Sequence, residues 1–385
     1  MKQVLSILLS LCLGLFIVAG LVSVADDSLV LLFNFHLLTA TSLILSIIAF
    51  LLALGVYVLM GLSPMIPKRV FLPVPLYVAA GLLAMFPALI YCPGRILQVD
   101  WVLSLGQVIL GLAILHRLRG GFKFRWLIVE PGHLGDRGFS WLNLTGFLLV
   151  NVLGLLPATV AYAALCFTLA VDHYSAGFLA VHPGGLTVQV RKYVRNDGKT
   201  IQLVPMAHIG EADFYRKISK SFPSNSIILM EGVTDRKRLL TNEVSYKRAA
   251  KSLGLAEQEE EFAPTRGELV MADVDVEQFS TNTIGLLNLV MFFHAKGINA
   301  GSLLALTQYS PPPHLQDEVI DDLLRKRNQH LLDEIKARLP ETENIIVPWG
   351  VAHMPEIAGE IQASGFRLDN SQEYTVIRFH FVRKK

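Results

Sequence analysis

The sequence predicts a membrane α-helical bundle followed by an α/β domain with a central, mostly parallel or mixed sheet. Residues 1–171 contain only 14 of the 66 charged residues of the chain, and residues 172–385 contain the other 52. Long apolar segments fill the first part. In the second part short apolar runs alternate with amphipathic segments, as strands and helices do in α/β domains. We therefore predict a membrane domain at 1–171 and a soluble domain at 172–385.

Five segments of the first part are long enough to form membrane helices, since a helix that crosses a bilayer needs roughly 20 apolar residues. They are residues 4–25, 36–62, 71–92, 99–116 and 141–171. The first segment could instead be a signal peptide, because Ser23-Val24-Ala25 resembles a cleavage site. Its apolar run is longer than that of a usual signal peptide, so we favour a membrane anchor. Pro157 is expected to kink the fifth segment.

Lysine and arginine residues are unevenly distributed between the connections of these segments. The side that contains the N-terminus has Lys2, Lys68, Arg69, Arg117, Arg119, Lys123, Arg125 and Arg137. The opposite side has Arg95 alone, together with Asp26, Asp27 and Asp100. Because positive connections stay in the cytoplasm, we expect a cytoplasmic N-terminus and, after five crossings, a periplasmic or extracellular C-terminal domain.

The acidic residues of the first part are few, and we expect none of them in the interior of the five segments. Asp26, Asp27 and Asp100 are placed at segment ends, and Glu130 and Asp136 lie in the connection before the fifth segment. Transporters usually need ionisable groups inside the membrane. We therefore expect the five segments to anchor a multi-pass protein in the lipid bilayer of the cell membrane rather than to form a conduit.

The charge of the second part argues against nucleic-acid binding. It has 25 lysine and arginine residues against 27 aspartate and glutamate residues, without a basic stripe. All three cysteines lie in the apolar part. We therefore expect neither a disulfide nor a cysteine nucleophile in residues 172–385.

Two histidines of the second part follow apolar runs in the same context. The sequences "VPMAHIGEA" at 204–212 and "PWGVAHMPEI" at 348–357 both contain Ala-His, then two residues, then glutamate. The pairs are His208 with Glu211 and His353 with Glu356. If the two strands are neighbours in the sheet, both histidines lie at one carboxyl edge, where α/β proteins build their sites.

A third polar residue, Glu231, ends the apolar run "NSIILM". A carboxylate in such a place is costly unless it is paired or bound to a metal. His208, His353 and Glu231 could bind a divalent cation such as Mn, Co or Zn and leave a position open for water or substrate. Glu211 or Glu356 could act as general base or orient a histidine. The alternative is that both glutamates only stabilise the first turns of helices.

An ordered set of short sequences between residues 185 and 368 resembles the TraB/Tiki family, within the wider group of erythromycin esterases and ChaN-like haem-binding proteins. They are "IGEADFY", "IILMEGV", "SLGLAEQ", "MADVDVEQFS", "RNQHLLDEI" and "GVAHMPEIAGEIQASGFR". The resemblance implies the Tiki/ChaN-like α/β fold for the C-terminal domain. It also implies a membrane-tethered, metal-dependent peptidase with two G-x-x-H motifs and a glutamate.

The second of these motifs is intact, from Gly350 to His353, whereas Pro205 replaces the glycine before His208. Proline fixes φ where glycine is free, so this departure changes the backbone freedom of the first motif. Glu231 matches the family glutamate.

Arg327 and Asn328 match the Arg-Asn pair that the family has on a late helix. Arg327 could stabilise negative charge that develops on a carbonyl oxygen, or it could be a surface cation. Asn328 could orient the substrate or a ligand histidine.

These observations lead to one hypothesis and one rival. We expect a membrane-anchored, metal-dependent hydrolase, specifically a metallopeptidase that acts on extracytoplasmic peptides or proteins. The rival is a non-enzymatic binding module that sequesters a peptide signal, or holds haem through His208 or His353, at the cell surface.

Overall fold

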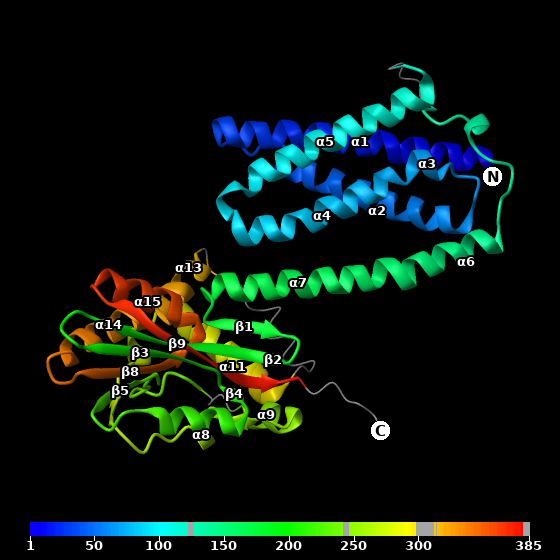
Figure 1. Cartoon of the computed structure of the whole chain (residues 1–385). Coiled ribbons are helices and arrows are strands. Elements are labelled where there is room, and N and C mark those ends of the chain that lie inside the picture. The colour runs from blue at the N-terminus through cyan, green and yellow to red at the C-terminus, as the bar shows by residue number, and fades with distance from the viewer. Residues whose placement is uncertain (122–126, 242–245, 298–311, 313, 380–385) are drawn as a thin grey trace, which may run out of the picture. The chain divides into compact units, whose positions relative to one another are not determined.

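The computed structural model describes residues 1–121, 127–241, 246–297, 312 and 314–379 (Figure 1). Lys123 and Arg125, which contribute to the charge bias of the connections, lie outside these residues. The chain forms two compact units, Met1–Phe167 and Thr168–Lys385. A helical region comes first and a mixed α/β unit second, which confirms the predicted fold class at this level.

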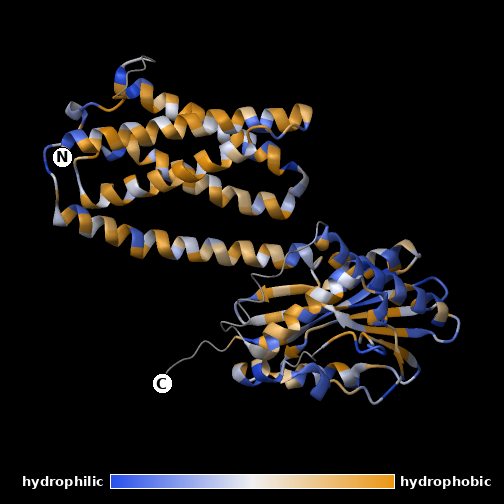
Figure 2. Ribbon diagram, turned by 180° about the vertical axis from the view of Figure 1, so that it is seen from behind, coloured by the Kyte–Doolittle hydropathy of each residue, from blue (hydrophilic) through white to orange (hydrophobic). Residues whose placement is uncertain are grey.

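The first unit contains helices α1 (Lys2–Phe33), α2 (Thr39–Leu62), α3 (Lys68–Phe71), α4 (Pro73–Tyr91), α5 (Ile96–Arg119) and α6 (Trp141–Leu149), and α7 (Leu156–Tyr174) continues from it. Five helical stretches of the described residues are long and apolar enough to cross a membrane. Each contains most or all of one predicted segment. In the ribbon of Figure 2 most residues of these helices have the colour of hydrophobic residues. Their length and composition indicate a membrane protein whose helices associate with a lipid bilayer.

The prediction that Asp26, Asp27 and Asp100 lie at the ends of the membrane segments is wrong. α1 continues to Phe33 and so includes Asp26 and Asp27, and α5 starts at Ile96 and so includes Asp100. A polar side chain does not end a helix, because the helix is held by hydrogen bonds of the backbone, which a polar side chain leaves intact. α1 ends instead at Asn34, whose left-handed φ of 50° is typical of a C-cap. Three carboxylates therefore belong to the helices themselves.

The fifth stretch is irregular where a proline interrupts it. α6 passes through a π-helical segment, Val150–Leu155, into α7, and Pro157 is the second residue of α7. Proline has no N–H to donate to the residue four positions earlier, and its ring crowds that carbonyl. A wider π-helical turn just before the proline accommodates both effects.

The second unit is built on one seven-stranded mixed sheet. Its strands are β1 (Leu179–His182), β2 (Gly185–Val194), β3 (Thr200–Met206), β5 (Ser226–Met230), β7 (Glu268–Met271), β8 (Asn344–Gly350) and β9 (Arg367–Arg378). Their order is β1-β2-β3-β8-β5-β7, and β9 pairs with β2. β2 is antiparallel to β1, β3 and β9, whereas β3, β8, β5 and β7 are parallel to one another. A separate two-stranded sheet joins β4 (Ile209–Gly210) to β6 (Ala256–Glu257).

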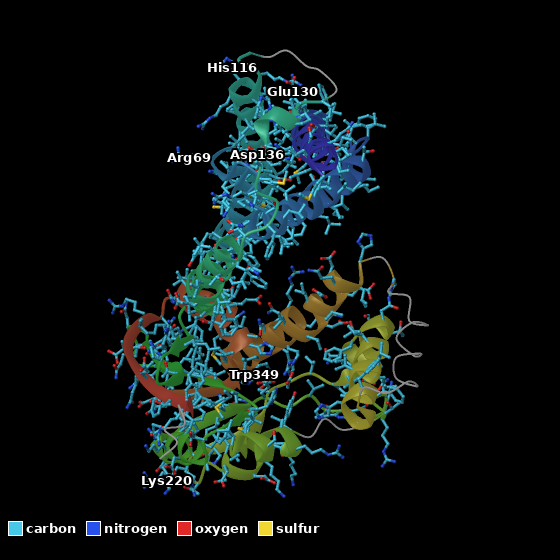
Figure 3. The ribbon with its side chains drawn as sticks, turned by 90° about the vertical axis from the view of Figure 1, so that its right-hand side faces the viewer. Arg69, His116, Glu130, Asp136, Lys220 and Trp349 are labelled. Carbon is cyan, nitrogen blue, oxygen red and sulfur yellow. The ribbon has the colours of Figure 1, made fainter. Side chains whose placement is uncertain are left out.

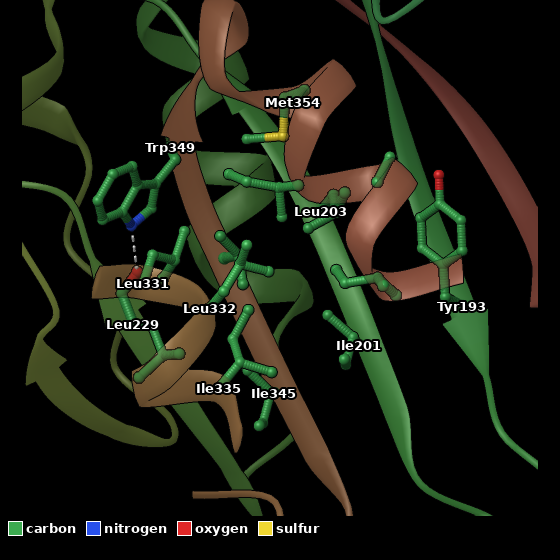
Figure 4. Close-up of a cluster of buried hydrophobic side chains, with 14 of the residues drawn as sticks. Tyr193, Ile201, Leu203, Leu229, Leu331, Leu332, Ile335, Ile345, Trp349 and Met354 are labelled. Carbon is green, nitrogen blue, oxygen red and sulfur yellow. Dashed lines mark hydrogen bonds between the residues drawn. The ribbon is translucent and has the colours of Figure 1, made fainter. Parts of the chain in front are cut away.

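Helices cover both faces of the seven-stranded sheet. Ile201, Leu203 and Ile345 pack beneath α14 (Arg327–Arg338) and α15 (Met354–Ala363), as Figure 4 shows. The alternate residues Val204 and Ile346 pack on the opposite face with α8 (Ala212–Ser221). This alternation follows from the two-residue period of a strand. The described part of the unit also contains α9 (Lys247–Leu253), α10 (Gln258–Glu261), α11 (Thr281–Lys296), α13 (Leu315–Ile320) and a π-helical segment, Asp321–Lys326, that leads into α14.

Trp349 is the largest buried side chain among the described residues of this unit, whereas Lys220 lies at the periphery of the unit (Figure 3). The indole Nε1 of Trp349 donates a hydrogen bond to the carbonyl of Leu229, with 2.9 Å between nitrogen and oxygen (Figure 4). Burying an indole without a partner for its N–H would be costly. The bond ties β8 to β5 at the carboxyl end of the sheet.

The two histidine-bearing strands are neighbours, which confirms the condition on which the predicted site depends. β3 and β8 pair in parallel, with Met206 opposite Gly350. Pro205 lies inside β3, opposite Trp349. β2 pairs with β3 only between Thr200 and Leu203, so the proline lies beyond that ladder and removes no donor from it.

Candidate functional site

Polar residues follow all four strands of the parallel part of the sheet at its carboxyl edge. His208 follows β3, His353 follows β8, Glu231 follows β5 and Asp273 follows β7. Of these four side chains, those of Glu231, Asp273 and His353 meet around Arg327, the first residue of α14. We call Arg327 and these three residues the Arg327 cluster. It occupies the edge at which open α/β sheets bind their ligands.

Arg327 donates to two carboxylates. Its Nε and Nη2 lie 2.9 and 2.6 Å from Oδ1 and Oδ2 of Asp273, and Nη2 also lies 2.7 Å from Oε1 of Glu231. The side chain is 11% exposed, so the surface-cation alternative does not apply. Burial lowers the pKa of Arg327, but the hydrogen bonds and negative charges of Asp273 and Glu231 outweigh it and raise that pKa above its usual value. The guanidinium is thus a fixed positive charge.

Asp273 is a residue of the cluster that the sequence reasoning missed. Its side chain is fully buried, and it accepts hydrogen bonds from the backbone N–H groups of Gly232 and Val274 as well as from Arg327. The signal was present in "LVMAD", where an aspartate follows a short apolar strand as Glu231 follows another. A buried carboxylate with four donors positions Arg327 rather than reacting.

Glu231 is the most exposed side chain of the three, at 17%. Its Oε2 accepts a hydrogen bond from the backbone N–H of Gly350 at 2.5 Å. A Cβ atom at Gly350 would lie 3.4 Å from that oxygen, which is an ordinary van der Waals distance, so the hydrogen bond itself does not require a glycine. The motif glycine and the family-like glutamate are in direct contact through this bond.

His353 is oriented by a chain of hydrogen bonds. Its Nδ1 lies 2.6 Å from Oδ1 of Asn328, and Nδ2 of Asn328 lies 2.6 Å from Oε2 of Glu356. The amide NH₂ of Asn328 donates to Glu356, which leaves the amide oxygen as an acceptor for His353. Nδ1 of His353 must then carry the proton, and the lone pair of the ring lies on Nε2.

The Nε2 atom of His353 faces the cluster. It lies 3.3 Å from Nη1 of Arg327 and 3.6 Å from Oε1 of Glu231. Burial lowers the pKa of His353, and the positive charge of Arg327 lowers it further, against the opposing effect of Glu231. The imidazole is therefore held neutral, as a base or a ligand must be.

His208 and Glu211 do not join this cluster in the described structure. The ring of His208 is exposed and stacks on that of Tyr246, with 4.8 Å between centroids and 5° between planes. Glu211 precedes α8 without a side-chain cap, and its Oε1 accepts a hydrogen bond from the backbone N–H of Arg378 at 3.3 Å. Glu356 lies in the first turn of α15 and also holds Asn328.

The predicted metal ligands do not fit a divalent cation as they are arranged. Among the described residues, no group of three or more His, Cys, Asp or Glu side chains could hold a metal ion. Glu231 and His353 approach one another, but the guanidinium of Arg327 contacts both and occupies the position that a metal ion between them would need. Three suitably placed donors are the minimum for a catalytic zinc site.

Comparisons of the chain with protein-family models, with curated protein sequences and with solved structures find no match. The resemblance to the TraB/Tiki family therefore stays a prediction.

Proposed function

We propose that the C-terminal unit is a hydrolase of peptide bonds in which the Arg327 cluster is the reaction centre. The observation that carries the proposal is the pair of acceptors at its centre. Nε2 of His353 and Oε1 of Glu231 lie 3.6 Å apart, and the side chain of Glu231 is partly exposed. A neutral imidazole and a carboxylate at this separation can both accept hydrogen bonds from one water molecule.

In the proposed reaction His353 is the general base. As the water oxygen attacks the carbonyl carbon of the peptide, Nε2 takes one of its protons. The same proton then passes to the leaving nitrogen when the C–N bond breaks, so the imidazole returns to its neutral form. Asn328 and Glu356 keep Nδ1 protonated and the ring in position throughout.

Arg327 supplies the positive charge for the carbonyl oxygen. Its Nε and Nη2 are occupied by Asp273 and Glu231, whereas Nη1 makes only long contacts of 3.3 Å to His353 and 3.4 Å to the carbonyl of Leu323. Nη1 is thus the guanidinium donor most available to a substrate oxygen. A fixed donor of this kind stabilises the tetrahedral intermediate.

The substrate class and the side of the membrane come from the sequence. The family-like order of short sequences supports a peptidase of the TraB/Tiki type with a Tiki/ChaN-like fold. The lysine and arginine bias of the connections supports an extracytoplasmic C-terminal unit, with extracytoplasmic peptides or proteins as substrates. No step of this mechanism uses a metal ion.

The rival hypothesis is a haem-binding module, and in this structure the histidine available to bind haem is His208. Its ring is exposed, whereas both ring nitrogens of His353 are in contact with neighbours and this residue is 4% exposed. Haem titration of the full chain, with His208→Ala beside it, separates the two. A haem spectrum lost in His208→Ala, without peptide cleavage, would replace the hydrolase proposal.

The proposal is tested with the purified full chain in lipid nanodiscs and a library of quenched fluorescent peptides. Arg327→Gln should lose at least a hundredfold in cleavage rate, because removal of one oxyanion donor costs roughly that much. Arg325→Gln is the matched control, since Arg325 lies two residues earlier and its guanidinium is 64% exposed. Equal rates in both variants, or no cleavage by the wild-type chain, would overturn the proposal.

The same assay decides whether a metal takes part. The chain is treated with a chelator, dialysed and assayed before and after addition of Mn, Co or Zn. Cleavage that survives the chelator agrees with the proposed mechanism. Cleavage that is lost and then restored by one of these metals would require Arg327 to leave Glu231 and His353, and would overturn the metal-free mechanism but not the peptidase.

A further inference from the structure

A cavity of about 680 Å³ lies within the helical unit, between α1, α2, α4 and α5. Its lining includes the carboxylates of Asp26 and Asp27 from the last third of α1 and of Asp100 from the second turn of α5. Pockets for small organic molecules usually measure roughly 300 to 1,000 Å³. The cavity therefore has the size of a ligand site.

The carboxylates of this cavity lack a compensating charge. Asp27 is 5% exposed, and its buried Oδ2 has no hydrogen-bond partner. Asp26 is equally buried, and its Oδ1 accepts one hydrogen bond, from the hydroxyl of Thr39 at 3.1 Å. Within the described residues no lysine, arginine or histidine forms an ion pair with Asp26, Asp27 or Asp100. His36 is the titratable base that lines the cavity with them.

A buried carboxylate without a partner is costly, and more so in a helix surrounded by lipid. Asp27 is such a group. Asp26 has one hydrogen bond and Asp100 is exposed, but both line the same cavity, so the three carboxylates repel each other. Each effect is relieved when a positive charge enters. The carboxylates thus indicate the charge of the missing ligand.

Most of the remaining lining surface is apolar, although hydroxyl groups such as those of Ser42 and Ser46 also line it, and the cavity is too large for a bare metal ion. Its walls include Leu43, Phe50, Leu82 and Met85. Gly81 of α4 also lines it, and a Cβ atom built on this glycine would meet no other atom within 4 Å. Inorganic cations need several oxygen ligands close around them, whereas this space offers room for a hydrocarbon body.

We propose that this cavity binds an amphiphilic organic cation, with the positive group beside Asp27 and Asp100 and the apolar body between α2 and α4. The helical unit is then a ligand-binding unit and more than an anchor. This inference does not depend on hydrolysis by the C-terminal unit.

The proposal is tested with tetraphenylphosphonium, a hydrophobic monovalent cation. Its binding to the full chain in phosphatidylcholine nanodiscs is measured by equilibrium dialysis, with empty nanodiscs as background. Asp27→Asn and Asp100→Asn should each weaken binding at least tenfold. The matched control is Asp136→Asn, because Asp136 belongs to the same unit but is 95% exposed and does not line the cavity.

A second pair of variants tests the space rather than the charge. Gly81→Leu should fill the cavity and weaken binding at least tenfold. Gly55→Leu places the same side chain on α2 at a glycine that also has free space but does not line the cavity, and it should leave binding unchanged. Size-exclusion chromatography confirms that each variant remains folded.

Three outcomes would overturn the proposal. The first is that tetraphenylphosphonium does not bind above background. The second is that the Asp27, Asp100 and Asp136 variants bind it equally well. The third is that the Asp27 and Asp100 variants lose binding of Na⁺ or Ca²⁺, while Gly81→Leu binds the organic cation as the wild type does, which would indicate an inorganic cation site.

Discussion

Asn328 holds His353 in a single tautomer, with 2.6 Å between Oδ1 of the amide and Nδ1 of the imidazole. The amide is itself fixed, because its Nδ2 donates to Glu356. Nε2 of His353 is therefore the basic nitrogen, and it faces Glu231 and Arg327. The chemistry proposed for this edge of the sheet depends on that orientation.

Asn328→Ala removes the amide and leaves the Nδ1–H of His353 and the carboxylate of Glu356 without their partner. We expect the unit to lose about 1–3 kcal/mol of unfolding free energy, the usual cost of unpaired buried groups. We also expect kcat to fall more than KM rises. Gln329→Ala, at the exposed next position, is the control and should change stability by less than about 0.5 kcal/mol. Equal effects of the two variants, measured by hydrogen exchange of β8 amides, would contradict the role of Asn328.

Arg327→Gln leaves the fully buried carboxylate of Asp273 without its cation. Breaking a buried pair in this way costs about 3–5 kcal/mol. Hydrogen exchange of the full chain should show that loss for Arg327→Gln and less than about 1 kcal/mol for the exposed Arg325→Gln. Adding Asp273→Asn should restore part of it. Independent, additive costs of the Arg327 and Asp273 substitutions would argue against the pair.

The stability of the C-terminal unit should depend on pH through His353. Burial and the charge of Arg327 lower the pKa of His353 in the folded state. The unfolded chain then binds a proton at His353 more readily than the folded chain does. The contribution of neutral His353 to the free energy of unfolding is therefore fully present above the ordinary pKa of about 6.5 and is lost as the pH falls below it. Unfolding measured between pH 7.5 and 5 should show a steeper loss for the wild type than for His353→Gln. Parallel curves would mean that His353 is not held neutral.

Gly185 tests the pairing of β2 with β9. A Cβ atom at this position would lie 2.2 Å from the carbonyl oxygen of Ile377, a backbone atom that cannot turn away. Gly185→Ala should therefore cost about 1–3 kcal/mol, the usual penalty of overpacking. Gly184→Ala has free space and should be close to neutral. Similar melting temperatures for the two variants would show that β9 does not pair in this register.

The side of the membrane is tested by a reporter fused to the C-terminus. Alkaline phosphatase folds and is active only outside the cytoplasm of a bacterial host, because it needs disulfides. We expect high phosphatase activity and no fluorescence from a green fluorescent protein fusion at the same point. The reverse pattern would place the C-terminal unit in the cytoplasm.

The coarse architecture could be predicted because it follows from strong local signals. Long apolar runs predicted the five helices, and the short apolar run before Ala207-His208 predicted a buried strand. The histidine-bearing strands were inferred as neighbours from the matching sequences that end in His208 and His353, and β3 and β8 do pair.

The composition of the site could be predicted only in part, because side-chain contacts over long separations leave little local trace. Glu231, Arg327, Asn328 and His353 were singled out and meet. His208 was expected beside His353 and instead stacks on Tyr246, since a shared sheet edge does not fix where a side chain turns. Asp273 was missed because its strand is short. The acidic cavity was missed because the ends of α1 and α5 were taken from hydropathy.

The most direct test of the reaction proposed for the Arg327 cluster is the rate of peptide cleavage by the full chain and by His353→Gln under the same conditions. Loss of a general base typically costs a hundredfold or more, so we expect at least that decrease with the chain still folded. An unchanged rate in His353→Gln would contradict the assignment of His353 as the base and the location of the reaction at this edge of the sheet.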